Sequence, residues 1–347
     1  MTHSYFENKI ALVTGACGTI GSELINQLLN VYNVKELIGL DNNESELFFM
    51  EQQYIDYPNA NFFLTDVRDK DALAQKCLGA DILFHAAAYK HVVLCERSPF
   101  EAVQTNILGV KNIIDAASEC NVEKVIFTSS DKAVNPTNVM GTSKLMGERL
   151  ITAANSSTRK GPIFASTRFG NVLGSRGSVI PIFREQIKKG EKVTLTDPDM
   201  TRFIMSINQA TKQVIDSVEY AKGGEVFVTK MPIIRIYDLA KVMLEELAPR
   251  YGNNPDNIEI DIIGSKPGEK LYEELMNIEE TRRTLELKNY FAILPAFRDL
   301  YKNISYEYSG IMSSTVTRPY NSANETALTR SELKDFLLNY DLLEEPE

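Results

Sequence analysis

The chain has 347 residues, with 44% hydrophobic and 24% charged side chains and a formal net charge of −10. This composition indicates a globular protein long enough for two lobes. The negative charge argues against nucleic-acid binding, which needs a basic face, although a local cluster of arginine and lysine can still hold a phosphorylated small molecule. The sequence shows no spacing typical of a metal site, no membrane span and no targeting segment, so we expect a cytoplasmic protein.

A glycine-rich turn follows the first predicted strand, residues 9–14, and leads into an amphipathic helix. Glycines there let backbone N–H groups and the helix N-terminus approach a pyrophosphate closely. The residues expected at the pyrophosphate are Gly15, Gly18, Thr19, Ile20 and Gly21. A turn without a ligand is the alternative, but the acidic residue that closes the next strand argues against it.

Acidic residues end the second and third predicted strands. Asp41 closes the strand at residues 36–40, where its carboxylate would bind the ribose hydroxyls of a dinucleotide and repel a 2′-phosphate. This arrangement predicts NAD rather than NADP as the cofactor. Asp66, with Val67 beside it, either meets the adenine or caps the helix that follows.

The fourth predicted strand, residues 82–88, runs into small side chains. Ala86 and Ala87 would let the backbone lie against the cofactor. His85 is more typical of a hydrogen-bonded core histidine than of a catalyst. Lys90 follows the strand end and is either a substrate contact or a solvated loop lysine.

A long helix is predicted after Ser98. Ser98 and Glu101 have the spacing of a capping box, with proline at the first helical position between them. Apolar residues from Val103 to Ala117 then recur at helical spacing. Asn106 lies among them, and we expect its side chain to bond a neighbouring strand.

The stretch with the most reactive side chains lies between an apolar strand at residues 125–127 and a helix. It contains a hydroxyl, a carboxylate and two amines, at Ser130, Asp131, Lys132 and Lys144. Ligands of open α/β sheets bind outside the carboxyl ends of the strands, so this crossing is the predicted catalytic site. The alternatives are a serine that only caps a turn and a simple Asp–Lys surface pair.

The predicted fold is α/β, with a Rossmann-type doubly wound parallel sheet and a smaller, interleaved substrate-binding lobe. Residues 1–174 would form the NAD-binding domain, to which a strand near residues 224–230 returns. Residues 175–347 would form most of the substrate-binding lobe and the C-terminal tail.

These motifs resemble those of a known family. The chain is similar to the extended short-chain dehydrogenase/reductases, and within them to the nucleotide-sugar 4,6-dehydratases of bacterial polysaccharide synthesis. It looks closest to those that act on UDP-N-acetylglucosamine. The segments that carry the resemblance lie between about residues 8 and 280: 14–21, 86–92, 130–141, 170–181, 199–203 and 266–272.

The resemblance implies roles for residues whose spacing alone would place them at the surface. Asn171, Arg202 and Glu269 match positions that hold the UDP part of the substrate, and Lys90 matches a sugar contact. Arg176 joins this substrate-binding set. Lys144 matches the lysine that bonds the nicotinamide ribose.

One position departs from the family pattern. The usual Tyr-x-x-x-Lys pair has Met140 in place of the tyrosine, and a thioether is neither an acid nor a base. The group that takes the proton from the sugar 4-hydroxyl is then Ser130, Lys132 or a water molecule. Met140 is also the main argument for another interpretation, a non-catalytic NAD-binding sensor.

The implied reaction is the 4,6-dehydration of a UDP-N-acetylhexosamine for surface glycan synthesis, with or without inversion at C5. Hydride leaves C4, a base takes the C5 proton, the C6 hydroxyl leaves as water, and hydride returns to C6. Lys132 is the expected base, Asp131 the acid and Ser130 the partner of the C4 oxygen. An NAD-dependent nucleotide-sugar epimerase is the nearest alternative, because it also oxidises C4.

An assembly of identical subunits is also implied. The helix from Val103 to Ala117 and the helix after Met140 match those that pair subunits in similar enzymes. We therefore expect a homodimer or a larger homo-oligomer. The alternative is that both helices only cover the sheet.

Overall fold

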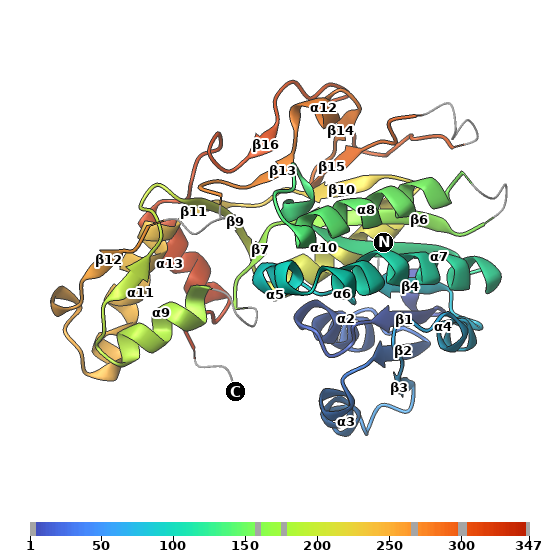
Figure 1. Ribbon diagram of the computed structural model, residues 1–347, viewed down its shortest axis with the longest axis horizontal. Helices are drawn as coiled ribbons and strands as arrows, with labels where there is room; N and C mark the ends of the chain where they lie inside the picture. Colours follow the sequence, from blue (N-terminus) through green and yellow to red (C-terminus); the bar gives the residue numbers. More distant parts are fainter. Residues whose placement is uncertain (1–4, 157–160, 175–178, 265–269, 298–303, 345–347) are drawn as a thin grey trace. The chain divides into compact units, whose positions relative to one another are not determined.

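The structure is a computed structural model, drawn as a ribbon in Figure 1. It describes residues 5–156, 161–174, 179–264, 270–297 and 304–344. The chain divides into two compact units that alternate along the sequence. Unit 1 comprises Met1–Phe169, Ala210–Lys230 and Met276–Pro319, and unit 2 comprises Gly170–Gln209, Met231–Leu275 and Tyr320–Glu347.

A nine-stranded sheet forms the centre of unit 1, in the order β14-β15-β10-β6-β5-β4-β1-β2-β3. Strand β15 pairs antiparallel with both its neighbours, and the remaining pairs are parallel. The order 3-2-1-4-5-6 is that of dinucleotide-binding folds, which confirms the predicted doubly wound sheet. The strands are β1 Ile10–Thr14, β2 Glu36–Asp41, β3 Ala60–Leu64, β4 Ile82–His85, β5 Lys124–Ser130, β6 Ile163–Phe169, β10 Val226–Thr229, β14 Thr284–Glu286 and β15 Tyr290–Ile293.

Helices cover this sheet, and their apolar faces form its core. Leu12, Leu83 and Val125 from three adjacent strands pack in one cluster with Val110 and Ile113 of α7. Burial on both faces explains why the parallel strands are almost continuously apolar in sequence. The helices are α2 Thr19–Asn30, α3 Glu44–Gln53, α4 Lys70–Cys77, α5 Val92–Arg97, α6 Pro99–Val103, η1 Gln104–Leu108, α7 Gly109–Glu119, η2 Asp131–Ala133, α8 Val139–Ala154, α10 Ile207–Tyr220 and α12 Ile278–Thr281.

The long helix predicted after Ser98 is interrupted. A five-residue π-helix, η1, separates α6 from α7, so Ile113 rather than Ile114 is buried beyond it. The predicted capping box is wrong, because the Ser98 side chain makes no capping hydrogen bond and Glu101 pairs instead with Arg68, with 2.8 Å between Oε2 and Nη1. Proline does occupy the first helical position, as predicted.

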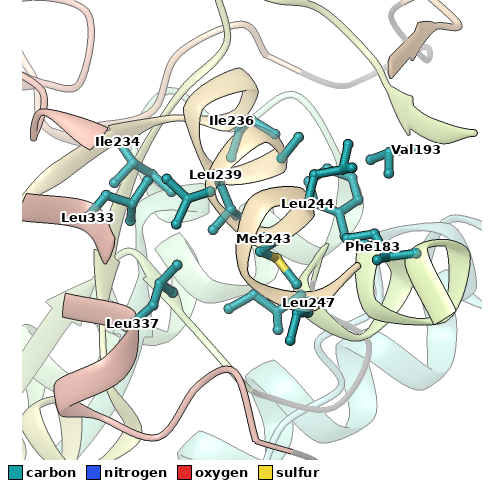
Figure 2. Packing of buried hydrophobic residues seen from close by; sticks show 14 of the residues in the cluster. Phe183, Val193, Ile234, Ile236, Leu239, Met243, Leu244, Leu247, Leu333 and Leu337 are labelled. Carbon is teal, nitrogen blue, oxygen red and sulfur yellow. The ribbon is translucent and has the colours of Figure 1, made fainter. Parts of the chain in front are cut away.

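Unit 2 is built around the helix α11, Ile236–Leu247. Figure 2 shows its apolar side chains, among them Leu239 and Met243, packed against Phe183 and Leu333 of two other helices. The remaining elements are α9 Val179–Lys188, α13 Arg330–Asn339, η3 Pro249–Tyr251, η4 Pro255–Asn257 and three small sheets: β7 Asn171–Val172 with β9 Thr201–Met205 and β11 Ile233–Arg235, β8 Val193–Leu195 with β12 Ile260–Ile262, and β13 Glu274–Met276 with β16 Tyr320–Asn321.

The compact units differ from the predicted division at residue 174. Unit 1 ends its first segment at Phe169 and regains Ala210–Lys230, which contains the expected returning strand β10. It also regains Met276–Pro319, which adds β14 and β15 to the sheet. Within the described ranges, every helix is too short or too polar to cross a bilayer.

Candidate active site

The glycine-rich turn follows β1 and opens α2, as predicted. Gly15 has φ +70°, and a Cβ there would lie 2.6 Å from the backbone nitrogen of Ala87, so only glycine fits this approach. A Cβ at Gly21 would lie 1.9 Å from the Gly15 oxygen. Gly18 caps α2 without a side-chain bond, and the first-turn N–H groups of Thr19, Ile20 and Gly21 have no partner within the helix. These N–H groups form a site suited to a phosphate.

The Asp41 carboxylate lies against the same turn. Its Oδ2 accepts from the backbone N–H of Cys17 at 2.9 Å, and its Oδ1 accepts from that of Asn43 at 3.0 Å. Each carboxylate oxygen can accept further hydrogen bonds, so ribose hydroxyls can be bound in addition. Binding of the ribose by Asp41 stays a prediction, and the position of its carboxylate beside the glycine turn is the one that this role needs.

Asp66 follows β3 and holds an ion pair. Its carboxylate accepts from Arg68 at 3.1 and 3.2 Å and from Asn42 at 3.3 Å. Burial alone would raise the pKa of Asp66, but these hydrogen bonds outweigh it and hold the pKa below its ordinary value. The cap of α4 is Asp69, so the alternative of Asp66 as that cap is wrong. The side chain of Val67 is buried against Gly109 of α7.

The segment after β4 is held in place by Asn106, whose role the sequence only partly indicated. The Asn106 amide accepts from the Tyr89 N–H at 2.8 Å and donates to the Tyr89 oxygen at 3.0 Å and to Ser143 at 2.9 Å. It therefore bonds the loop beyond the strand rather than the strand itself. The loop leads from Ala86, whose N–H donates to the Thr14 oxygen, to Lys90, which is exposed.

His85 is a core residue, as expected. It is fully buried, its Nδ1 lies 2.7 Å from the Thr14 hydroxyl, and its ring stacks on Phe127. Burial, with a further contribution from the Lys144 charge, lowers the pKa of His85 to about 3. The imidazole is therefore neutral at physiological pH.

Ser130, Asp131 and Lys132 form a hydrogen-bonded group at the carboxyl end of β5. The Ser130 hydroxyl donates to Asp131 Oδ1 at 2.6 Å, and the Lys132 ammonium lies 3.2 and 3.1 Å from the two carboxylate oxygens. The Asp131 side chain is only 3% exposed, whereas that of Lys132 is 35% exposed. Ser130 also accepts from the Lys132 N–H at 3.3 Å, so the capping role is present alongside any catalytic one.

The start of α8 is fitted closely to this group. A Cβ at Gly141 would lie 2.2 Å from the Lys132 carbonyl oxygen, which requires glycine at that position. Met140 is 3% exposed and packs with Cys95 and Ala102 of α5 and α6. The residue that replaces the usual tyrosine thus serves packing.

Lys144 is buried one turn further along α8. Its ammonium donates to the Thr128 oxygen at 3.0 Å and lies 4.7 Å from the centre of the Phe127 ring. Burial lowers the pKa of Lys144 to about 8, against the opposing influence of Glu148. Contact with a nicotinamide ribose stays a prediction.

A buried ion triad that the sequence did not reveal anchors α8. Arg168 of β6 donates to Glu148 at 2.9 and 2.6 Å and to Glu280 at 3.1 Å from each of two nitrogens. All three residues are almost fully buried. The only signal in the sequence is an arginine inside an apolar strand.

Of the substrate residues expected from the resemblance, Asn171 and Arg202 lie in unit 2. Arg202 forms an ion pair with Glu273, with 3.2 Å between Nε and Oε1, and donates to the carbonyls of Thr201, Lys270 and Leu271 at 2.7 to 3.2 Å. With its amide nitrogen turned toward the carboxylate, the orientation that its neighbours favour, Asn171 donates to both oxygens of Glu273 at 3.2 Å. The predicted contacts Arg176 and Glu269 lie outside the described residues.

The match to a family model decides the classification. Residues 11–295 match the family described as "Polysaccharide biosynthesis protein". The chain belongs to this family. The glycine turn, the sheet order and the family match together confirm the resemblance to extended short-chain dehydrogenase/reductases.

Similar proteins carry different names. Pen from Bacillus thuringiensis, a solved structure, is 41% identical with a TM-score of 0.88, over 97% of this chain and 99% of that one. A UDP-N-acetylglucosamine 4,6-dehydratase (inverting) of Campylobacter jejuni is 38% identical over 88% of this chain and 89% of that protein. A UDP-glucose 4-epimerase of Rickettsia bellii is 38% identical over 98% of both. An uncharacterized membrane protein of Methanocaldococcus jannaschii is 51% identical over 88% of this chain and 92% of that protein.

Solved structures with the same fold include several that hold NAD. They are 21% to 22% identical to this chain, with TM-scores of 0.61 to 0.65. At this identity they establish the fold alone.

Proposed function

We propose that this protein is an NAD-dependent 4,6-dehydratase. Its proposed substrate is a UDP-N-acetylhexosamine, specifically UDP-N-acetylglucosamine, which it converts to the 4-keto-6-deoxy derivative. The observation that carries the proposal is the buried Asp131 paired with Lys132 at the end of β5. β5 is the neighbour of β4, which is itself paired with β1, the strand that leads into the glycine turn. The Campylobacter dehydratase and the family match support the same substrate class.

NAD, bound at the glycine turn, would supply the acceptor for the hydride from C4 and its donor to C6. The residues proposed to hold it are the turn and helix start, two acids, the alanines after β4 and the buried lysine: Gly15, Gly18, Thr19, Ile20, Gly21, Asp41, Asp66, Val67, Ala86, Ala87 and Lys144. NADP is disfavoured because the Asp41 carboxylate would repel a 2′-phosphate.

The geometry of Ser130 suggests a proton route that replaces the missing tyrosine. Because the Ser130 hydroxyl donates to Asp131, its oxygen is left to accept the proton of the sugar 4-hydroxyl. As that proton arrives, Ser130 passes its own to Asp131, which becomes a carboxylic acid. Asp131 then gives this proton to the C6 hydroxyl, which leaves as water.

The same transfer prepares Lys132. While Asp131 is ionised, its carboxylate stabilises the Lys132 ammonium across 3.1 Å. Once Asp131 is protonated, that stabilisation is lost and the neutral amine is favoured. The Lys132 side chain is 35% exposed, so its ammonium can then release a proton to solvent. The neutral amine can remove the C5 proton, which the 4-ketone has made acidic, and return it to C5 when hydride reaches C6. The Asp131–Lys132 ion pair is therefore compatible with the dehydration only if Asp131 is protonated before Lys132 acts as the base.

The substrate would be held by Lys90 at the sugar and by Asn171, Arg202 and Glu269 at the UDP part, with Arg176 as a further substrate contact. The subunit would act as a homodimer or larger homo-oligomer. Exposed apolar side chains on α5 to α8 support that assembly: Val93, Leu94, Phe100, Leu108 and Met146.

Incubation with UDP-N-acetylglucosamine tests the proposal. We expect a product lighter by one water in the mass spectrum. A product of unchanged mass would favour the epimerase, and no conversion with NAD bound would favour the non-catalytic sensor.

A further inference from the structure

Lys144 is a buried amine without an ion pair of its own. The residue is 7% exposed, and its Nζ donates to the Thr128 oxygen at 3.0 Å. Within the described part of the chain, that carbonyl is the hydrogen-bond partner of the amine, and no carboxylate forms an ion pair with it. A buried charge is costly unless it is compensated, so the charges around Lys144 decide whether it is an ammonium.

The residue four positions further along α8 supplies a negative charge. Glu148 lies one helical turn from Lys144, on the same face of the helix, and is 2% exposed. Both of its oxygens accept from Arg168, at 2.9 and 2.6 Å, and a guanidinium stays charged in proteins. The Glu148 carboxylate is therefore held in one position, a single turn from the buried amine.

The charges of the Arg168 triad do not cancel. Arg168 carries one positive charge, whereas Glu148 and Glu280 carry one negative charge each, so the triad has a net charge of −1. A positive charge on Lys144 brings the buried group of four residues to zero. The low-dielectric interior favours such a balanced set over one with an excess charge.

The other titratable groups on the elements around Lys144 are neutral or bonded to partners of their own. His85 of β4 is neutral at physiological pH, because its pKa is about 3. Burial lowers the pKa of Lys144 to about 8, and the Glu148 charge opposes that fall. The remaining charged groups bond partners other than Lys144: Asp131 with Lys132, Glu279 with Arg283, and Glu96 with the Val139 N–H.

We infer that Glu148 is a positioning residue that acts through Lys144, and that its carboxylate keeps the buried amine in the charged form. An ammonium has three donors, and among the described residues Thr128 takes one of them, so two remain for a bound ligand. Charged donors form stronger hydrogen bonds with ribose hydroxyls than a neutral amine does. The benefit to NAD rests on the proposed function, whereas the charge of Lys144 does not.

The titration of Lys144 tests the inference without requiring turnover. In protein labelled with carbon-13 at the lysine ε-carbons, the NMR signal that Lys144→Met removes belongs to Lys144. We expect this signal to titrate with a midpoint near pH 8 in the wild type. In Glu148→Gln, which keeps the shape but removes the charge, the midpoint should fall by about one pH unit. Glu148→Asp, which retains the charge, should keep a midpoint close to that of the wild type.

Glu280→Gln is the matched control, because it disturbs the same triad. It also leaves Arg168 with one carboxylate, but the lost charge belongs to α12 rather than to the face of α8 that carries Lys144. The midpoint of Lys144 should therefore shift by less than half as much as in Glu148→Gln. A general loosening of the triad would move both midpoints alike.

The affinity for NAD, measured by calorimetry at two pH values, tests whether the charge matters to the cofactor. At pH 6 Lys144 is charged in both proteins, so the Kd for NAD in Glu148→Gln should be close to that of the wild type. At pH 8 this Kd should be about fivefold higher in Glu148→Gln, which is the ratio of the charged fractions for midpoints near about 8 and about 7.

Three results would overturn the inference. One is a wild-type midpoint near the ordinary lysine value of about 10.4, since Lys144 would then be charged without help. The others are equal midpoints in wild type and Glu148→Gln, and equal shifts in Glu148→Gln and Glu280→Gln. If the midpoint moves as expected but the Kd for NAD is unchanged at both pH values, the inference about Glu148 stands and the proposed contact between Lys144 and NAD is wrong.

Discussion

In the proposed reaction, one pair of neighbouring residues, Asp131 and Lys132, supplies both the acid and the base. At rest they form an ion pair, which is the wrong protonation state for both tasks. The 2.6 Å bond from Ser130 to Asp131 offers a route by which substrate oxidation itself corrects that state. The roles of these residues can therefore be separated by substitution.

Replacement of Lys132 removes the proposed base. In Lys132→Ala we expect uptake of solvent deuterium at C5 to be lost and turnover to fall by roughly 10²- to 10⁴-fold, while NAD remains bound. Mass spectrometry after incubation in D₂O measures the exchange. Lys111→Ala, which removes an exposed lysine paired with Asp115, is the matched control. Undiminished exchange at C5 in Lys132→Ala would remove Lys132 from the base role.

The neutral, buried His85 makes stability depend on pH. Its pKa is about 3 in the folded chain and 6.5 when unfolded, so below pH 6.5 the unfolded state takes up a proton that the folded state does not. The free energy of unfolding therefore falls as the pH drops, by about 2 kcal/mol between about pH 7 and 5 from this group. Urea unfolding at several pH values measures the slope.

Two histidine variants isolate that contribution. His85→Gln should show a weaker loss of stability on acidification than wild type. His91→Gln, at an exposed position, should keep the wild-type slope. Equal slopes in wild type and His85→Gln would show that His85 is not the group responsible.

At the scale of elements, α8 is the part on which the site most depends. It carries Lys144, its Gly141 lies against the Lys132 carbonyl, and its Glu148 is held by the buried Arg168. A shift of α8 would therefore displace Lys144 and the end of β5 together. The anchoring triad can be tested by substitution of its central residue.

Arg168→Met should destabilise the protein by about 3–5 kcal/mol, because it leaves the Glu148 and Glu280 carboxylates buried without their partner. Urea denaturation measures the loss. Arg149→Met, at an exposed position on α8, should change stability by less than about 0.5 kcal/mol. A loss at Arg168 no larger than that at Arg149 would contradict the anchoring role.

Sequence patterns predicted the elements well where apolar periodicity decides them. The strands of the dinucleotide-binding half and the glycine turn follow from local composition. The π-helix at Gln104–Leu108 does not, because its register depends on where Asn106 must reach. The Arg168 triad and the ion pair between Arg202 and Glu273 also escape prediction, since both join residues that are far apart in the chain.

At the scale of the whole molecule, the exposed apolar residues of α5 to α8 suggest association of subunits. Phe100 on α6 is 81% exposed. If identical subunits pair through these helices, Phe100→Asp should convert the oligomer to a monomer, which light scattering would detect. Phe49→Asp, which alters an exposed phenylalanine on α3, should leave the assembly intact. A monomeric wild-type protein, or an oligomer unaffected by Phe100→Asp, would contradict this interface.

The fate of the C4 hydrogen tests the dehydratase proposal most directly. With UDP-N-acetylglucosamine deuterated at C4, we expect the deuterium to reach the C6 methyl group of a product that has lost one water, as shown by NMR and mass spectrometry. Deuterium retained at C4, in a product of unchanged mass, would contradict the account and identify an epimerase instead.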